Sequence, residues 1–215
     1  AVPEEADALV LDLYRRLPEV RVTDLLLEVD DEIGFTEAFT HLRTGVPCKD
    51  RIGLLNVLLS EGLNLGLSKM AGATNTHDFF QLSRLSRWHV ESEAMARALA
   101  TVIEGQSRLP MARFWGGGQS ASSDGQFFPT TRQGEAMNLI NAKYGHEPGL
   151  KAYTHVSDQF GPFATQTIPA TVNEAPYILD GSLLTDARQK IPEQHADTGG
   201  FTDHVFAVTA LLGFQ

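Results

Sequence analysis

The sequence has one cysteine, Cys48, and no run of about 18 apolar residues. A lone cysteine cannot form an internal disulfide, and a membrane-spanning helix needs about 18 to 20 consecutive apolar residues. With 42% hydrophobic and 20% charged residues, the 215-residue chain has a globular composition, which excludes disordered, collagen-like and coiled-coil proteins. We therefore predict a soluble folded protein, with no membrane partner, in a reducing cytoplasm.

The sequence also lacks a surplus of basic residues. Its net charge is -10, and a division at Pro110 leaves 11 basic against 17 acidic residues before it and 6 against 10 after it. Proteins hold the phosphates of DNA with clustered Lys and Arg side chains. Neither half of this segment is therefore expected to bind DNA strongly by itself.

The ends of the sequence lack the marks of a complete chain. It begins with Ala1 rather than Met, and no basic region followed by an apolar stretch indicates a secretory signal. An apolar pattern that starts at Phe206 reaches Gly213 and stops two residues later. We expect the sequence to be a segment of a longer protein.

Leucine stripes dominate the first 110 residues. Leu9, Leu13 and Leu17 recur at spacing four, and Thr23 is a candidate N-cap for a helix that Gly34 ends. Residues 91–104 form a last helix. The segment 49–70 carries a further stripe at helical spacing, made of Ile52, Leu55, Leu59, Leu63 and Leu67. The predicted first domain is an all-helical region, 1–112, with this stripe and Trp88 in its core.

After Trp115 the apolar runs shorten to strand length. Residues 119–130, 150–158 and 163–171 are predicted strands, the last two forming a hairpin. A helix over 175–190 and a short strand into Ala196 follow, and Thr202 or Thr198 caps a final helix. Three antiparallel strands, a crossover helix and a parallel strand open a ribonuclease-H-like fold. The predicted class is α+β, with residues 113–215 forming a mixed sheet that lacks its last strand and helix.

Two aspartates carry the candidate chemistry. Asp124 falls in the middle of the first predicted strand, where a charge is costly unless it binds a partner, and Asp197 follows the fourth strand. Because these strands are neighbours in this topology, both carboxylates would project into one cleft. Paired carboxylates can hold Mg²⁺ ions that act on a phosphodiester. The spacing leaves open that Asp124 is an ordinary Asp-Gly turn residue.

Other polar residues have plainer interpretations. Asp158 is read as a turn residue, and His155 as a structural histidine, with a DNA or metal contact as the alternative. Asp203, beside His204, is expected to cap a helix or face solvent rather than bind metal.

Two further motifs suggest no chemistry. The serines of 120–123 lack a Gly-x-Ser-x-Gly elbow, which argues against a serine hydrolase. The glycine-rich stretch 115–119 lacks the Lys-Ser/Thr of a phosphate-binding loop, so it is read as a flexible connector. Cys48 is read as an ordinary thiol.

Six stretches, spread from about residue 18 to the end, resemble the replicative transposases of the Tn-three family, from class II bacterial transposons. They are 18–30, 34–45, 64–71, 122–126, 153–159 and 197–206. The resemblance implies a ribonuclease-H-like catalytic core with an Asp-Asp-Glu triad. Asp124 matches the first catalytic and metal-binding aspartate, and Asp197 the second.

The resemblance also implies what such enzymes do. Water attacks a phosphodiester at each transposon end, and the freed 3′-hydroxyl then attacks target DNA, with Mg²⁺ or Mn²⁺ as cofactor. The partners it implies are DNA, as transposon ends and target, and further copies of the protein in a homo-oligomer. In the family the catalytic Glu lies well beyond the stretch that matches 211–215, so we expect this segment to lack it, to leave its metal site empty and not to cut DNA.

Two functions from different classes follow. The first is a catalytic-core segment of a DNA transposase, an enzyme in its full-length form. The second is a non-catalytic module, either a folded relic or an interaction surface built by residues 1–110.

Overall fold

The computed structural model describes residues 3–130, 139–143, 145–183, 191–196 and 202–214. The chain divides into two compact units. We call residues 1–36 and 49–86 the helical unit, and residues 37–48 and 87–215 the sheet unit. The sheet unit includes helices that precede residue 113. The predicted division into a helical domain, 1–112, and a catalytic domain, 113–215, therefore stays a prediction about function.

The helical unit contains five helices and the start of a 3-10 turn among its described residues. They are α1 (Glu4–Arg16), α2 (Val22–Ile33), η1 (Phe35–Ala38), α3 (Arg51–Gly62), α4 (Leu67–Ala73) and α5 (Phe79–His89). Gly34 ends α2 in the left-handed conformation, with φ of 66°, as its lack of a Cβ allows. The prediction that Thr23 caps this helix is wrong, because α2 begins at Val22 after Arg21.

The predicted helix over 49–70 is two helices. The chain leaves α3 at Leu63, and Asn64 and Gly66 take positive φ values of 50° and 80° before α4 begins. Leu54 and Val57 are fully buried. Ile52 and Leu63, which the leucine stripe places in the core, are 42% and 60% exposed, so that prediction is wrong for them.

Close packing at Gly53 explains which side of α3 is buried. A Cβ at this position would lie 2.4 Å from a Leu85 side-chain carbon of α5. The missing side chain lets α5 approach α3 on the side of Gly53, Leu54 and Val57 rather than on the side of the leucine stripe.

The sheet unit contains the remaining described elements. They are α6 (Ser92–Ser107), α7 (Pro110–Trp115), β1 (Ser120–Pro129), β2 (Leu139–Ile140), β3 (Pro148–Ser157), β4 (Pro162–Pro169), α8 (Tyr177–Leu183), β5 (Glu193–Ala196) and α9 (Asp203–Leu212). The predicted order of strands and helices after Trp115 is confirmed, and the part of the predicted helix 175–190 that follows Leu183 lies outside the described residues. Of the two predicted caps of the final helix, Thr202 is confirmed, because its hydroxyl accepts from the Val205 amide, and Thr198 lies outside the described residues. Helix α7 and strand β2 were not predicted. No helix in the described ranges is long and apolar enough to cross a membrane.

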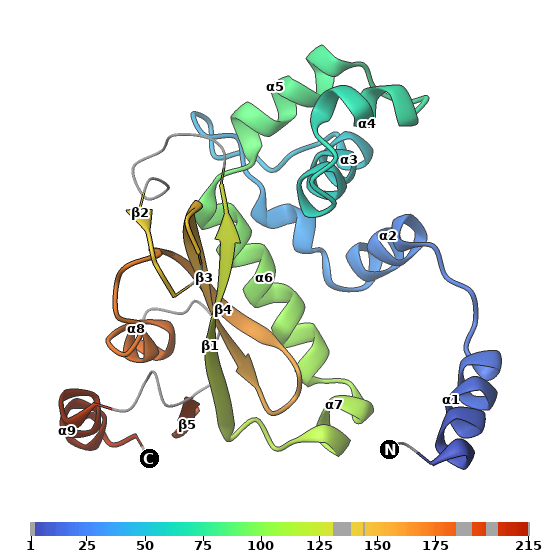
Figure 1. Ribbon diagram of the computed structural model, residues 1–215. Helices are drawn as coiled ribbons and strands as arrows, with labels where there is room; N and C mark the ends of the chain where they lie inside the picture. Colours follow the sequence, from blue (N-terminus) through green and yellow to red (C-terminus); the bar gives the residue numbers. More distant parts are fainter. Residues whose placement is uncertain (1–2, 131–138, 144, 184–190, 197–201, 215) are drawn as a thin grey trace. The chain divides into compact units, whose positions relative to one another are not determined.

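The strands form one mixed sheet with β3 at its centre (Figure 1). β3 pairs antiparallel with β1 along one edge and with β4, and briefly β2, along the other. β5 pairs parallel with the outer edge of β1. The predicted hairpin and the predicted neighbourhood of the first and fourth strands are therefore confirmed. This α+β arrangement is consistent with a ribonuclease-H-like domain.

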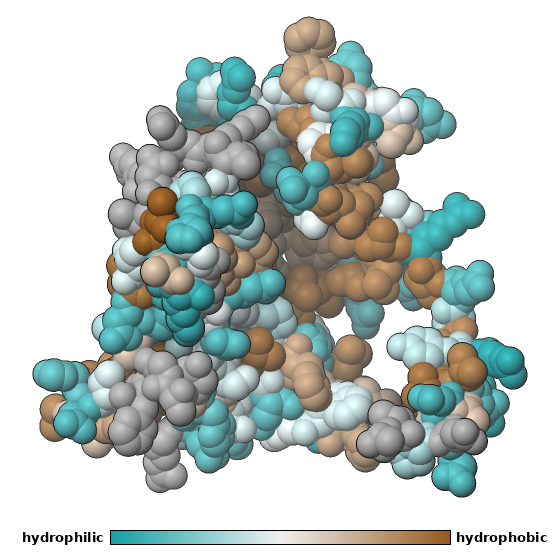
Figure 2. Space-filling model, in the orientation of Figure 1, coloured by the Kyte–Doolittle hydropathy of each residue, from teal (hydrophilic) through white to brown (hydrophobic). Residues whose placement is uncertain are grey.

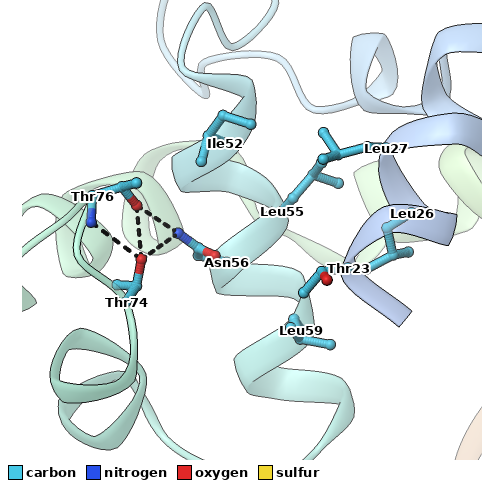
Figure 3. Close-up of a pocket in the computed structure, with 9 residues that line it drawn as sticks. All are labelled: Thr23, Leu26, Leu27, Ile52, Leu55, Asn56, Leu59, Thr74 and Thr76. Carbon is cyan, nitrogen blue, oxygen red and sulfur yellow. Dashed lines mark hydrogen bonds between the residues drawn. The ribbon is translucent and has the colours of Figure 1, made fainter. Parts of the chain in front are cut away.

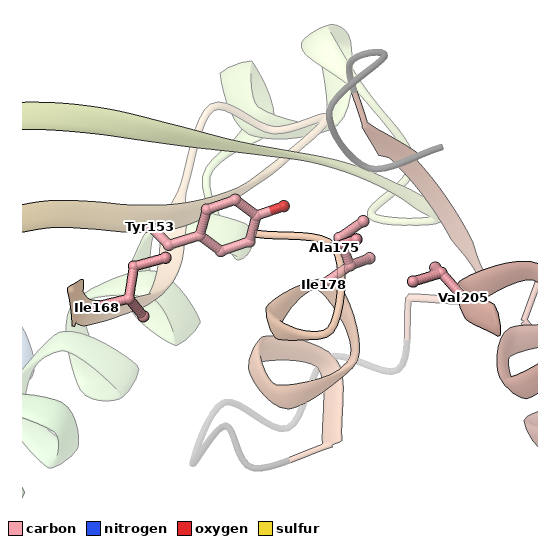
Figure 4. Packing of buried hydrophobic residues seen from close by; sticks show 5 residues of the cluster. All are labelled: Tyr153, Ile168, Ala175, Ile178 and Val205. Atoms are coloured by element: carbon pink, nitrogen blue, oxygen red, sulfur yellow. The ribbon is translucent and has the colours of Figure 1, made fainter. Parts of the chain in front are cut away.

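Helices pack on one face of this sheet through two apolar clusters. Tyr153 and Ile168 contact Ala175 and Ile178, at the start of α8, and Val205 of α9 (Figure 4). A second cluster joins strand residues Ala121 and Phe163 to Ile103 of α6 and to Ile191. Burial of such side chains stabilises a fold by about 1.5–3 kcal/mol each.

Trp88 lies outside these clusters. It is 38% exposed and stacks on the His41 ring, with 4.9 Å between ring centroids and 12° between planes. The prediction of a core tryptophan is therefore wrong, because the indole packs against a surface loop of the sheet unit instead.

Candidate active site

Asp124 lies in the middle of β1 with an exposed side chain. Along β1 the exposed residues Ser122, Asp124 and Gln126 alternate with Ser123 and Gly125, as the two-residue period of a strand requires. We call the side that carries Asp124 the Asp124 face, and the opposite side the His155 face.

Polar side chains of three strands form a row across the Asp124 face. Asp124 is in register with Thr154 of β3, which is in register with Thr165 of β4. The Thr165 hydroxyl donates to that of Thr154 at 3.3 Å. One Asp124 carboxylate oxygen accepts from the Gly125 amide at 2.7 Å. Among the described residues no cation forms an ion pair with Asp124, so its second oxygen is open to a ligand.

Asp197 lies outside the described residues. The strand pair that leads to it is described: Ser122 is in register with His195, and Ser123 with Ala196. Ser123 and Ala196 each directly precede one of the two aspartates. The distance between the two carboxylates stays a prediction, and the described residues contain no group of three His, Cys, Asp or Glu placed for a metal ion.

His155 supports β1 directly behind Asp124. Its Nδ1 lies 2.7 Å from the Ser123 hydroxyl, and its side chain is fully buried. Desolvation by this burial lowers the pKa of His155 to about 4, against opposing contributions from the Tyr177 backbone and the charge of Asp180. The imidazole is therefore neutral at pH 7. The prediction of a structural histidine is confirmed.

Gly181 of α8 packs against the other side of the same ring. A Cβ at Gly181 would lie 2.0 Å from Nε2 of His155. The crossover helix therefore approaches the sheet closely enough to fix the imidazole between α8 and β1.

A buried ion pair lies behind Gly125. The Lys151 ammonium, 4% exposed, contacts the Glu174 carboxylate at 2.6 Å and donates to the Val172 carbonyl at 2.8 Å. A Cβ at Gly125 would lie 2.6 Å from the same carboxylate. The glycine that follows Asp124 thus leaves space for Glu174. Nothing in the sequence pattern indicated this pair, because its members are 23 residues apart.

Asp158 holds the glycine-rich stretch in place. Its carboxylate accepts from the Gly118 amide at 2.8 Å and from the Gln119 amide at 3.2 Å, and a Cβ at Gly116 would strike it. The interpretation of Asp158 as a turn residue is confirmed. The interpretation of 115–119 as a flexible connector is wrong, because these hydrogen bonds tie it to the β3–β4 turn.

The remaining candidates take no part in this site. Asp203 and His204 are exposed in the first turn of α9, which confirms the prediction that Asp203 faces solvent. The Ser123 hydroxyl is engaged by His155, and Cys48, the one cysteine of the sequence, is half-buried and forms no internal disulfide.

The helical unit has a separate, shallow cavity of about 160 Å³ between α2 and α3. Figure 3 shows Leu26, Leu27, Leu55 and Leu59 around it, with Asn56 bonded to Thr74 and Thr76 at one side. Figure 2 shows hydrophobic surface over these two helices. Apart from the amide and three threonine hydroxyls the lining is apolar, and it contains no titratable group.

The comparisons with known proteins agree with this architecture. Residues 24–215 match the family described as the Tn3 transposase DDE domain. The transposase of transposon Tn501 from Pseudomonas aeruginosa is 44% identical over 215 residues, and that of Tn21 from Escherichia coli is 43% identical over 215 residues. The transposase of Tn1546 from Enterococcus faecium is 37% identical over 219 residues. Each match covers 100% of this chain and 22% of the relative, so the chain spans about a fifth of those proteins.

Proposed function

Because the chain belongs to the Tn3 transposase DDE domain family, we propose that it supplies part of the catalytic core of a DNA transposase. In this proposal Asp124 and Asp197 bind divalent metal for the hydrolysis and transfer of DNA strands. The observation that carries the proposal is the position of Asp124, exposed in mid-strand beside the parallel strand that leads to Asp197.

The residues at hand fit a hard divalent cation. Mg²⁺ prefers carboxylate oxygens, and Asp124 offers one that no described cation occupies. A bound ion would supply charge neutralisation and a lowered pKa for the attacking oxygen. The role of Asp124 in this proposal is to bind the cation and hold it in position. The buried pair of Ser123 and His155 holds its strand, so little reorganisation is needed on binding.

The activity proposed for the whole protein needs residues that this segment does not contain. We propose that a longer protein contributes the third carboxylate, the residues that recognise transposon ends and the contacts between copies in a homo-oligomer. Removal of one member of a cooperating catalytic set abolishes most of the rate. The 215 residues alone are therefore expected to fold and not to nick DNA, even with Mg²⁺ or Mn²⁺.

A non-catalytic role is favoured by one observation in the helical unit. Helix α1 and its C-cap residue Leu17 carry exposed apolar side chains: Leu9, Leu13, Tyr14 and Leu17 are each more than half exposed. A solvent-facing apolar stripe of this kind marks a contact surface for another chain segment. This interaction role does not compete for the Asp124 face.

Iron-mediated cleavage tests the metal proposal without enzymatic activity. Fe²⁺ bound in place of Mg²⁺ generates hydroxyl radicals in the presence of ascorbate and peroxide, and these cut the backbone near the ion. We expect cuts near residues 124 and 197 that Asp124→Asn abolishes and Asp12→Asn, on exposed α1, leaves unchanged. Cuts elsewhere, or cuts that survive Asp124→Asn, would contradict the proposal.

A further inference from the structure

Three aromatic rings project at the end of the sheet where β1 begins. Phe114 and Trp115, at the end of α7, and Phe160, in the β3–β4 turn, are 79%, 56% and 66% exposed. Trp115 meets Phe160 edge to face at 5.3 Å between ring centroids, and Phe114 meets Trp115 at 5.8 Å. We call these three residues the aromatic cluster.

The backbone at Phe160 gives independent reason to assign this cluster a role. Phe160 has a positive φ of 59°, a conformation that glycine adopts without strain and that costs other residues about 1–2 kcal/mol. The turn thus keeps an exposed phenylalanine where glycine would be more stable. Strained backbone of this kind concentrates at functional sites.

An open groove of about 540 Å³ lies beside the cluster. Arg113, Gly116, Gly117, Gly118 and Gln159 line it. Among the described residues Arg113 has no acidic partner, whereas the carboxylate of the nearby Asp158 is engaged by backbone amides. A guanidinium without an acidic partner suits a phosphate.

The cluster is continuous with the Asp124 face. A smaller cavity of about 230 Å³ is lined by Phe160 together with Ser122 and His195 of that face. The Asp158 amide bonds the Ser120 carbonyl, four residues along β1 from Asp124. Four residues of strand span about 13 Å, the rise of about four stacked nucleotides.

We propose that the aromatic cluster and Arg113 hold an unpaired nucleotide of the DNA strand that is acted on at Asp124. The base stacks on the aromatic rings, and its phosphate lies against the guanidinium. Stacking on an aromatic ring tolerates any base, because every base has a π-face. This inference rests on the proposed function, whose substrate it narrows to DNA with a locally unpaired strand.

Trp115 fluorescence provides the test. The chain has two tryptophans, so Trp88→Phe leaves Trp115 as the sole indole. The probes are a short duplex with a single-stranded thymidine overhang, the blunt duplex, and the same overhang carrying abasic sugars. We expect the thymidine overhang to quench Trp115 and to bind more tightly than both other probes.

Two variants sharpen the result. Phe160→Gly relieves the backbone strain, so it should fold at least as well, yet weaken overhang binding about 5- to 150-fold. Arg113→Gln should weaken the binding of both the thymidine overhang and the abasic overhang. As a control, Phe80→Ala, at an 80% exposed phenylalanine of the helical unit, should leave the affinity for all three probes unchanged.

Equal affinity for thymidine and abasic overhangs, or no quenching with any probe, would overturn the inference. Self-association of the chain that Phe160→Gly abolishes, without discrimination among the probes, would assign the cluster to a protein partner and overturn it as well. Iron-mediated cleavage at Asp124 is independent of these rings. Loss of discrimination with cleavage intact overturns the inference and leaves the proposed function standing. Loss of cleavage with quenching intact overturns the proposed function and leaves only the binding of an unpaired nucleotide by the aromatic cluster.

Discussion

The two faces of the sheet come from the same strands and differ in burial, charge and partners. The His155 face carries Tyr153 and His155 under α8, with the Lys151 ammonium paired to Glu174. The Asp124 face carries Ser122, Asp124, Gln126 and Thr165 with exposed side chains. Because a strand alternates its side chains, one residue step separates a position that stabilises the fold from one that is free to bind. Adjacent substitutions can therefore separate stability from function.

The largest contrast is expected between Tyr153→Ala and Thr154→Ala. Tyr153 is 2% exposed and lies at the centre of the apolar cluster with α8, so its truncation should cost about 3–5 kcal/mol of unfolding free energy. Thr154, its neighbour on the Asp124 face, should change stability by no more than about 0.5 kcal/mol. Denaturant unfolding measures both, and equal losses would refute the assignment of the two faces.

Acidification should lower the free energy of unfolding through the buried imidazole of His155. The folded-state pKa of His155 is about 4 against an ordinary 6.5, so the unfolded chain takes up the proton first as pH falls. The neutral imidazole contributes fully to the free energy of unfolding above about pH 6.5. This contribution falls on acidification, by about 3 kcal/mol at pH 4. Unfolding free energies at pH 7 and pH 4, compared with those of His155→Gln, isolate this loss. An identical pH dependence in the variant would contradict it.

Gly181→Ala should disturb the contact of α8 with the His155 ring. The added methyl would overlap the imidazole, so we expect a loss of about 1–3 kcal/mol, measured by thermal or denaturant unfolding. Gly62→Ala is the matched control, because a Cβ there meets nothing within 4 Å. It should leave stability unchanged or raise it by up to about 1 kcal/mol. Equal effects at both glycines would argue against the close packing of α8.

The smallest stability effect is expected for Asp124→Asn. Its side chain is exposed and forms no ion pair with a described residue, so unfolding free energy should change by about 0.5 kcal/mol at most. Metal-dependent backbone cleavage should nevertheless disappear. A large loss of stability in the variant would place Asp124 among the structural residues instead.

Local patterns predicted the strands well and the helical packing poorly. The strand order and the β3–β4 hairpin followed from short apolar runs and turn residues, and the Thr202 cap from its position before an apolar run. The leucine stripe of 49–70 misled because the burial of α3 depends on where α5 approaches, at Gly53. Periodicity reports one helix at a time and contains no information about its neighbours.

The sequence predicted Asp124 as a candidate site residue but not the contacts that hold its strand in place. Asp124 stood out as a charge in mid-strand, and its assignment came from the family resemblance. The hydrogen bond of His155 to Ser123 and the ion pair of Lys151 with Glu174 join residues 32 and 23 positions apart. Only the register of β1 with β3 and the return of the chain after β4 bring them together.

In the function that we propose, Asp124 and Asp197 share a metal. A crystal structure of this chain grown with a large excess of Mn²⁺, which offsets the weak binding expected without the third carboxylate, tests it most directly, with the ion located by its anomalous scattering. We expect a Mn²⁺ peak in contact with both carboxylates, which approach within roughly 4–8 Å of each other. Carboxylates more than about 12 Å apart, or on opposite faces of the sheet, would contradict it, because no ion could then bridge them.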